Sequence, residues 1–432
     1  MLRTLINAFR EKEIRKKMLL TLLMLLVFRL GCFIPVPGIV ANSFQSLAEN
    51  NDFFSVMSTI TGGSLQNGTL FALGIIPFIN AFIIMQLLTL VIPPLDRLSK
   101  QGEAGRRKIT QITRYMAILL AVIQGVGICL GWGGDMFEAT FESTKLTMAL
   151  VIMMFVGGSC LVMWIADRIT EYGVGNGTSL IIFAGILSSA GTSLVNAFSG
   201  VTDGEVAKNV WMIIAFLVVV VAVFIFIIFV DLAERRITIQ YAKQIKGNKM
   251  YGGQSTHIPM KVNASGVMPI IFASSFLMFP QMIASFWPDS KFYAWWVKWL
   301  SMNQPIGIAL MCLLILFFAF FYSQIQFNPE DISKNIQQNG GYIPGIRPGR
   351  PTADFLKKIN NRITLFGAIF LAIIALVPAV IFKFIGEAGG SGASLANSFS
   401  ATGLLIVVSV AMEFDTQLQN QLMMKHYKGF LK

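Results

Sequence analysis

The sequence VWMIIAFLVVVVAVFIFIIFV occupies residues 210–230 and contains only apolar side chains. A run of about 20 such residues forms a helix long enough to cross the hydrocarbon core of a bilayer. Comparable stretches recur along the whole chain of 432 residues. They predict ten transmembrane helices, at residues 18–34, 70–92, 112–132, 148–165, 179–198, 210–230, 267–287, 306–325, 363–384 and 395–412. We therefore expect an all-α polytopic membrane protein.

The composition excludes several other classes of protein. Only 13% of the residues are charged, whereas a soluble domain has about 25%. The chain therefore lacks the polar surface that a soluble enzyme of this length needs. The four cysteines, Cys32, Cys129, Cys160 and Cys312, all lie in apolar stretches without close spacing. This pattern predicts neither a disulfide scaffold nor a metal site, and we expect no cofactor.

The distribution of basic residues predicts the orientation in the membrane. With a cytoplasmic N-terminus, 28 of the 34 Lys and Arg residues fall in cytoplasmic segments and 5 in external ones. These totals count Arg114 and Lys383, which stand at the borders of their spans, with the adjoining segments; Arg29 lies further inside a span, and no Lys or Arg occurs between it and Arg97. Because cytoplasmic loops are enriched in Lys and Arg, both termini are predicted to be cytoplasmic. Ile34-Pro35-Val36-Pro37-Gly38 follows the first span in place of a small-residue cleavage site, so we do not expect a signal peptide.

The ten spans divide into two halves of five, and an odd number of spans inverts one half relative to the other. We expect a cytoplasmic N-terminal segment, two five-helix halves and a cytoplasmic tail, at residues 1–17, 18–200, 201–412 and 413–432. The second span of each half carries the pattern G-x-x-P-x-I, at residues 74–79 and 266–271. Gly and Pro are common in membrane helices, so chance is one explanation. The other is that both helices face a central pathway, with Ile79 and Ile271 at equivalent depth.

Two cytoplasmic loops, residues 231–265 and 327–362, carry six basic residues each. The second contains GGYIPGIRPGR at residues 340–350, in which Gly and Pro fix turns and leave Arg347 projecting. Basic loops of this kind bind either anionic lipid headgroups or a protein partner. Their length favours a cytoplasmic docking partner.

An external segment, FFSVMSTI at residues 53–60, is amphipathic but too short to span the membrane, and Gly62-Gly63 follows it. It forms either an interfacial helix or a segment that folds back between the spans. Irregular backbone is tolerated there if it is buried in protein or lines a cavity.

No feature of the sequence predicts an enzyme. Residues 172–177 (YGVGNG) superficially resemble a phosphate-binding loop, but no strand precedes them and no G-x-x-x-x-G-K-[ST] motif is present. All 22 acidic residues and both histidines fall in loops or at span borders, which leaves an intramembrane nucleophile without a base. A secondary solute transporter shares the inverted repeat and stays an alternative, although coupled carriers commonly use an ionisable group within the membrane. An ion channel would need acidic rings or carbonyl loops.

Six stretches carry motifs of a known family. They are RLGCFIPVPG at 29–38, KQGEAGRR at 100–107, GVGNG at 173–177, QSTHIP at 254–259, PGIRPG at 344–349 and LLIVV at 404–408. In this order, they resemble the SecY family of protein-translocation channel subunits over essentially the whole chain. The resemblance implies a clamshell of ten helices in two inverted halves around an hourglass-shaped central pore. It also implies a lateral gate between spans 2–3 and 7–8.

The resemblance further implies which residues do the work of the channel. The family's constriction ring corresponds to Ile79, Ile83, Ile182, Ile186, Ile271 and Ile406. An external plug corresponds to about residues 53–66, with Phe53, Phe54, Met57, Ile60, Gly62 and Gly63. The lateral gate corresponds to Gln124, Ser274 and Ser275, whose side chains either form interhelical hydrogen bonds or only permit close packing. Docking corresponds to Arg347, with Arg350 and Lys249, although some members have a basic pair where Asn248-Lys249 stands here.

The implied function is a passive conduit in the bacterial cell membrane. It passes unfolded preproteins that carry signal sequences and releases apolar segments sideways into the lipid. Since no nucleotide site is visible in the sequence, a partner must supply the energy. The family's partners are the SecA motor ATPase, the ribosome and the small membrane subunits SecE and SecG.

Overall fold

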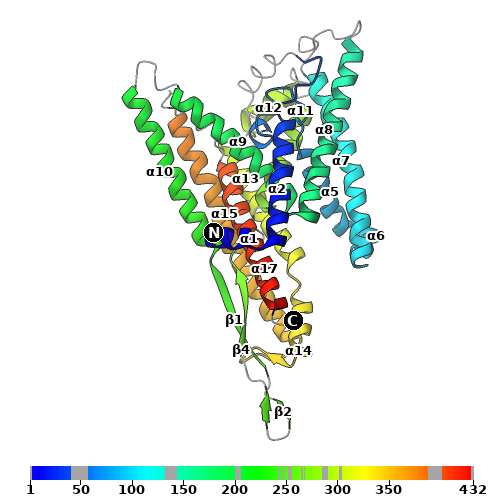
Figure 1. The fold of residues 1–432 in the computed structure, drawn as a ribbon, viewed down its shortest axis with the longest axis vertical. Helices are drawn as coiled ribbons and strands as arrows, with labels where there is room; N and C mark the ends of the chain where they lie inside the picture. Colours follow the sequence, from blue (N-terminus) through cyan, green and yellow to red (C-terminus); the bar gives the residue numbers. More distant parts are fainter. Residues whose placement is uncertain are drawn as a thin grey trace.

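The computed structural model describes residues 2–39, 57–131, 144–199, 206–241, 244–246, 249–251, 255–263, 266, 268–284, 290–300, 304–387 and 401–429. Each predicted span overlaps one helix of this part of the chain (Figure 1). These helices are α2 (Lys12–Gly31), α5 (Ile76–Val91), α7 (Glu103–Gly131), α8 (Thr144–Tyr172), α9 (Gly177–Ser199), α10 (Val206–Asp231), α11 (Met268–Ala284), α13 (Pro305–Gln326), α15 (Arg350–Glu387) and α17 (Ala401–Gly429). The mainly helical fold expected from the sequence is confirmed.

Length and apolar composition alone identify fewer membrane-crossing helices. Among the described residues, four helical segments are long and apolar enough to span a bilayer, at Glu103–Cys129, Lys145–Tyr172, Pro305–Gln338 and Arg350–Leu376. A fifth candidate is α5 together with α6 (Pro93–Ser99), which are bent by 105° relative to each other. The count of ten spans therefore stays a prediction.

The two ends of the described chain lie at the same end of the helical bundle (Figure 1). The short helix α1 (Leu2–Arg10) packs against α17, where Ala8 and Leu418 share a buried cluster with Ile14, Met18 and Val174. A chain that crosses a membrane an even number of times returns to the side on which it started. The packing of α1 on α17 places both ends of the described chain on one side, as such a path requires.

A small antiparallel sheet extends from that same end of the bundle, so the all-helical prediction is incomplete (Figure 1). The strand β1 (Glu234–Tyr241) lies between β4 (Ser255–Lys261) and β5 (Gly341–Tyr342). A separate hairpin contains β2 (Gln244–Lys246) and β3 (Lys249–Tyr251). Because β5 belongs to the second predicted cytoplasmic loop and the other strands to the first, the two loops form one folded unit.

The sheet is held on the bundle by one apolar face. Ile237 and Ile239 of β1 are buried, while the residues between and beside them are more exposed, as expected for a strand with one covered face. These side chains join a cluster with Ile336 of α14 (Pro329–Gln338) and Leu356 of α15. This cluster ties the two predicted cytoplasmic loops to the long helix α15.

Contacts between helices distant in sequence bring the two halves together. α11 packs against α5 and α7 of the first half and against α13 of the second, while α17 packs against α9 and α10. The largest buried hydrophobic cluster lies where α5, α9, α11 and α17 meet. This cluster contains all six isoleucines that are expected to form the constriction.

Candidate functional site: pore constriction and plug

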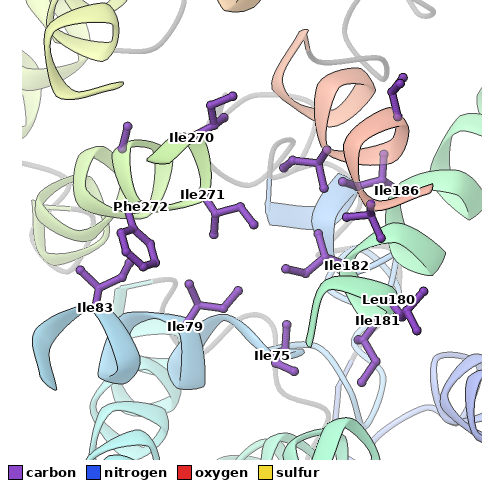
Figure 2. Packing of buried hydrophobic residues seen from close by; sticks show 14 of the residues in the cluster. Ile75, Ile79, Ile83, Leu180, Ile181, Ile182, Ile186, Ile270, Ile271 and Phe272 are labelled. Atoms are coloured by element: carbon purple, nitrogen blue, oxygen red, sulfur yellow. The ribbon is translucent and has the colours of Figure 1, made fainter. Parts of the chain in front are cut away.

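The six isoleucines expected to form the constriction lie in this one buried cluster, and each exposes only 2% to 6% of its surface. They come from α5 (Ile79, Ile83), α9 (Ile182, Ile186), α11 (Ile271) and α17 (Ile406). In Figure 2, Ile79, Ile271 and Ile182 point toward one another from three different helices. The structure thus brings together residues that are up to 327 positions apart in the chain.

The two G-x-x-P-x-I stretches have the same local structure. Gly74 and Gly266 adopt positive φ values of 54° and 60°, which glycine accepts without steric cost. The helices α5 and α11 then begin two residues later, with proline as their second residue. Proline suits the first turn of a helix because its missing N–H has no intrahelical partner there. Ile79 and Ile271 are therefore each the fourth residue of their helix, and the two helices pack against each other.

Further apolar side chains, which the prediction did not include, complete this cluster. Ile75 is also buried, and Figure 2 shows it between Ile79 and Ile182. It lies four residues before Ile79, so the spacing that groups Ile79 with Ile83 extends to it. Since the predicted span 70–92 contains Ile75, the same spacing could have selected it from the sequence, although the helix α5 itself begins one residue later.

The described part of the predicted plug is a short folded unit; Phe53 and Phe54 lie outside the described residues. The chain is helical at residues 57–60 and then turns. The Thr61 hydroxyl donates to the carbonyls of Met57 and Ser58 at 3.0 and 3.3 Å, and the Ser64 hydroxyl donates to the Thr61 carbonyl at 2.9 Å. Thr69 donates in the same way to the Ser64 carbonyl at 3.0 Å. These bonds allow a segment rich in Ser and Thr to be buried.

The predicted plug packs on α9, the helix that carries two of the predicted constriction residues. Gly185 of α9 lies between Ile182 and Ile186, and a Cβ atom at Gly185 would come within 2.3 Å of the Ile60 carbonyl oxygen. One turn later, the Ser189 hydroxyl donates to the Thr59 carbonyl at 3.1 Å. The segment predicted to be the plug therefore contacts α9 on the turns that carry Ile182 and Ile186.

Two apolar side chains of the plug face the predicted lateral gate. Met57 and Leu65 are buried in a cluster with Ala121 and Ile128 of α7 and Met278 of α11. The helices α7 and α11, expected on opposite sides of the gate, thus both contact the predicted plug. A separation of α7 from α11 would uncover these side chains.

The three predicted gate residues are buried, and within the described part of the chain no interhelical hydrogen bond, one of the two expectations, is seen for them. Ser274 donates to the Ile271 carbonyl of its own helix at 3.0 Å, as serine in a helix commonly does. Gln124 is fully buried, and neither polar atom of its amide has a hydrogen-bond partner among the described residues. Ser275 is also buried. For Ser274, the packing alternative is the one that fits.

The predicted docking loop is braced at its tip. Gly345 and Gly349 have positive φ values of 81° and 97°, and the Thr352 hydroxyl donates to the Arg347 carbonyl at 2.8 Å. The Ser333 hydroxyl binds the Gly349 carbonyl at 2.7 Å. Arg347 and Arg350 have exposed side chains on this framework. The third predicted docking residue, Lys249, begins β3 in the separate hairpin.

Comparison with known proteins agrees with this arrangement. The SecY family model matches residues 69–414 of the chain. Protein translocase subunit SecY of Bacillus subtilis is 42% identical over 444 residues, and that of Halalkalibacterium halodurans is 41% identical over 438 residues. Both alignments cover 100% of this chain and 100% of the relative.

Solved structures share the fold at lower sequence identity. A protein-conducting channel superimposes with a TM-score of 0.67 at 20% identity, and a SecY structure with a plug domain superimposes with 0.66 at 19%. Sec61 from a canine ribosome–channel complex gives 0.62 at 19%. Each alignment covers 94% of this chain and 91% of the other. Together with the full-length relatives, these findings show that the chain belongs to the SecY family.

Proposed function

We propose that this chain forms the pore of a protein-conducting channel, with the six isoleucines as its constriction and the plug as its external seal. One observation carries the proposal. Isoleucines from four helices converge in one cluster, and the short segment at residues 57–65 packs beside them against Gly185 of α9. The related SecY structure is described as having a plug domain that stabilises the closed state and maintains a membrane seal. The same role is proposed for residues 53–66 here.

An apolar constriction suits a conduit for arbitrary polypeptides. A passing chain presents charged, polar and bulky side chains in turn, so the constriction must not bind any of them specifically. Narrow apolar constrictions also exclude water and ions when idle. Isoleucine is stiff at χ1, so a ring of six gives a defined yet deformable contact around the passing chain.

The contact between the two halves of the chain is the proposed site of lateral release. α11 contacts α5 and α7 across this seam, and the buried gate residues lie on α7 and α11. We propose that apolar segments leave the pore between these helices into the lipid. The comparisons favour this translocation function over the alternative solute transporter.

Energy and assembly are proposed to come from partners. The braced, exposed Arg347 and Arg350 are proposed to dock a cytoplasmic motor of the SecA type, and the similarity to ribosome-bound Sec61 suggests the ribosome as a second partner. SecE and SecG are proposed as membrane partners, and the bacterial cell membrane as the location, with both termini cytoplasmic.

Crosslinking of a stalled preprotein tests the proposed pore. Cysteines replace Ile79, Ile182 or Ile271 in a chain from which the four native cysteines have been removed. Each should crosslink to a secretory chain arrested during export. The matched control is a cysteine at Ile225, which is exposed on the outer surface of α10 and should not react with the chain. Equal crosslinking from Ile225 and the constriction positions would refute the assignment of the pore.

A further inference from the structure

Arg29 is the one charged side chain that the sequence places inside the first span, and the features described above leave it without a role. It lies in the last turn of α2 with a half-buried side chain. Its guanidinium lies 4.7 Å from the ring centroid of Phe33, and its Nη1 donates to the carbonyl oxygen of Gly62 in the plug at 2.8 Å. No ion pair joins it to a carboxylate of the described residues. A charged donor within a membrane span thus has a backbone oxygen of the plug as its partner.

The geometry of the plug makes this contact specific. Gly62 and Gly63 have positive φ values of 71° and 84°, so the chain turns sharply where Arg29 binds. A Cβ atom on Gly62 would lie 3.0 Å from Arg29 Nη1 on one side and 3.1 Å from Gly185 Cα on the other. Gly62 is therefore enclosed between α2 and the helix that carries Ile182 and Ile186. Displacement of Gly62 from this position between the two helices would break the bond to Arg29.

The plug is otherwise attached in a way that permits such a movement. Its C-terminal side is fixed to the end of the first span, since the Val36 amide donates to the Gly68 carbonyl at 3.1 Å and the Leu70 amide to the Ile34 carbonyl at 2.9 Å. The hydroxyls of Thr61 and Ser64 bond within the plug itself. These hydroxyl bonds therefore do not depend on the contact of the plug with Arg29.

We propose that Arg29 is the positioning residue of the closed plug: from α2 it donates to the Gly62 carbonyl and selects the position in which Gly62 packs on Gly185 beside the constriction. The inference rests on the proposed sealing role of the plug and adds the residue that sets its resting place. The bond is charge-assisted, and therefore stronger than a bond between two neutral groups, although its acceptor is only a backbone carbonyl.

The first test measures resting ion leak in planar bilayers, with the channel purified together with the subunits that accompany it. Hydrogen bonds to charged groups are strong enough that the loss of one changes an equilibrium by about tenfold or more. Arg29→Gln should raise the leak by about that factor. Arg29→Lys keeps the charge but loses the forked donor geometry and should give an intermediate leak. The matched control is Arg168→Gln, at an arginine that stacks on Trp164 and Tyr172 away from the plug, and it should leave the leak unchanged.

The second test reports the position of the plug directly. The Cys32 thiol lies 4.0 Å and the Ser64 hydroxyl 2.9 Å from the same carbonyl oxygen of Thr61. In a chain that retains Cys32 but lacks Cys129, Cys160 and Cys312, Ser64→Cys should form a disulfide with Cys32 when the plug is in place. Arg29→Gln should slow this reaction about tenfold. Oxidation of the Arg29→Gln, Ser64→Cys variant should then restore the low leak, which would not occur if Arg29 only supported folding of α2.

The outcomes separate the two proposals. If deletion of residues 53–66 raises the leak but both Arg29 variants behave as wild type, the positioning role is wrong and the plug role stands. An unchanged leak after the deletion would reject the plug role, and the positioning role with it. If Arg29→Gln does not accumulate in the membrane, the disulfide rate of the Arg29→Lys variant decides, and a wild-type rate there refutes the inference.

Discussion

Ile271 is the proposed constriction residue on α11, the helix proposed to form one side of the lateral gate, and a polar side chain there should weaken the closed state. In the apolar cluster, an asparagine amide at position 271 or 406 would have to find a partner or remain unpaired, at a cost of about 1–3 kcal/mol. Water entering the constriction would relieve this cost. Ile271→Asn and Ile406→Asn should therefore raise ion leak and allow export of preproteins with defective signal sequences.

The control for this prediction is Ile271→Leu, which conserves volume and apolar character and should retain a tight closed state. Conductance in planar bilayers and secretion of a reporter with a defective signal sequence measure the two effects. Wild-type leak and continued rejection of the defective signal in both asparagine variants would make these residues ordinary packing residues.

Gln124 gives a prediction of opposite sign. Its fully buried amide has no hydrogen-bond partner among the described residues, and such a group destabilises the arrangement that buries it by about 1–3 kcal/mol. Gln124→Leu should therefore stabilise the closed contact of α7 with the plug and raise the signal-sequence hydrophobicity required for export. A series of signal sequences of graded hydrophobicity measures this shift. Identical export of weak and strong signals by variant and wild type would contradict it.

At the scale of single residues, the sequence predicts some roles and not others for a physical reason. Ile79 and Ile271 could be selected because each is the last residue of a repeated sequence pattern, G-x-x-P-x-I. The role of Arg29 could not be predicted, because its partner is the carbonyl of Gly62, and every residue has a backbone carbonyl. Ser274 was open between two interpretations because a serine hydroxyl can bond to its own helix as well as to a neighbour.

At the scale of elements, the two glycines that precede α5 and α11 form a matched pair for mutation. Gly74→Ala and Gly266→Ala both place a side chain at positive φ, which costs about 1–2 kcal/mol. At Gly74, the new Cβ would also lie 2.9 Å from Thr61 Cγ2 of the plug, whereas at Gly266 no atom of the described residues lies within 4 Å. Both variants should melt at a lower temperature than wild type.

The difference between the two variants isolates the contact with the plug. Gly74→Ala should lower the melting temperature further and also raise ion leak, while Gly266→Ala should leave the leak unchanged. Thermal unfolding of the purified protein and bilayer conductance give the two measurements. Equal effects of both substitutions would mean that the Thr61 contact does not position the plug.

The elements themselves show where hydropathy is informative. The predicted span 70–92 begins as a helix only at Ile76, because the left-handed Gly74 precludes a continuous helix through the apolar residues before it. The chain bends by 105° after Val91, where Pro93 and Pro94 follow. The strand β1 was missed, although its alternation of polar residues with Ile237 and Ile239 is typical of a strand, because polar loops were expected outside the spans.

At the scale of the whole molecule, the braced loop gives a test of the proposed docking to a motor. Arg347→Glu should abolish motor-driven export, because the variant presents a negative charge on the same rigid tip. Stability should change by no more than about 0.5 kcal/mol, as for most exposed substitutions. Arg347→Lys should be partly active, because lysine lacks the planar fork of donors.

The control for docking is Lys334→Glu, which makes the same change of sign at an exposed residue of α14 in the same loop. It should export normally. Translocation of a preprotein into membrane vesicles measures both variants. Normal transport by Arg347→Glu would exclude the docking role.

Hydropathy and charge predicted part of the overall arrangement. Each predicted span overlaps a helix, and the two ends of the described chain lie at the same end of the bundle (Figure 1). What pattern alone could not provide was how distant segments meet. The contact of Gly62 with Gly185 joins the plug to α9 through two residues without side chains, and glycines that allow close approach look the same in a sequence as glycines in any turn.

The pairing of β1 with β5 has a consequence for how the channel is made. Gln240 of the middle strand β1 pairs with Tyr342 of β5. The ribosome therefore synthesises this partner strand about a hundred residues after β1, and after α11 and α13. A ribosome that stops within those residues leaves a chain with two strands, no third strand and no Arg347. The proposed docking surface around Arg347 and Arg350 is thus completed only after most of the molecule has been translated, so an unfinished chain lacks the tip on which a motor is proposed to dock.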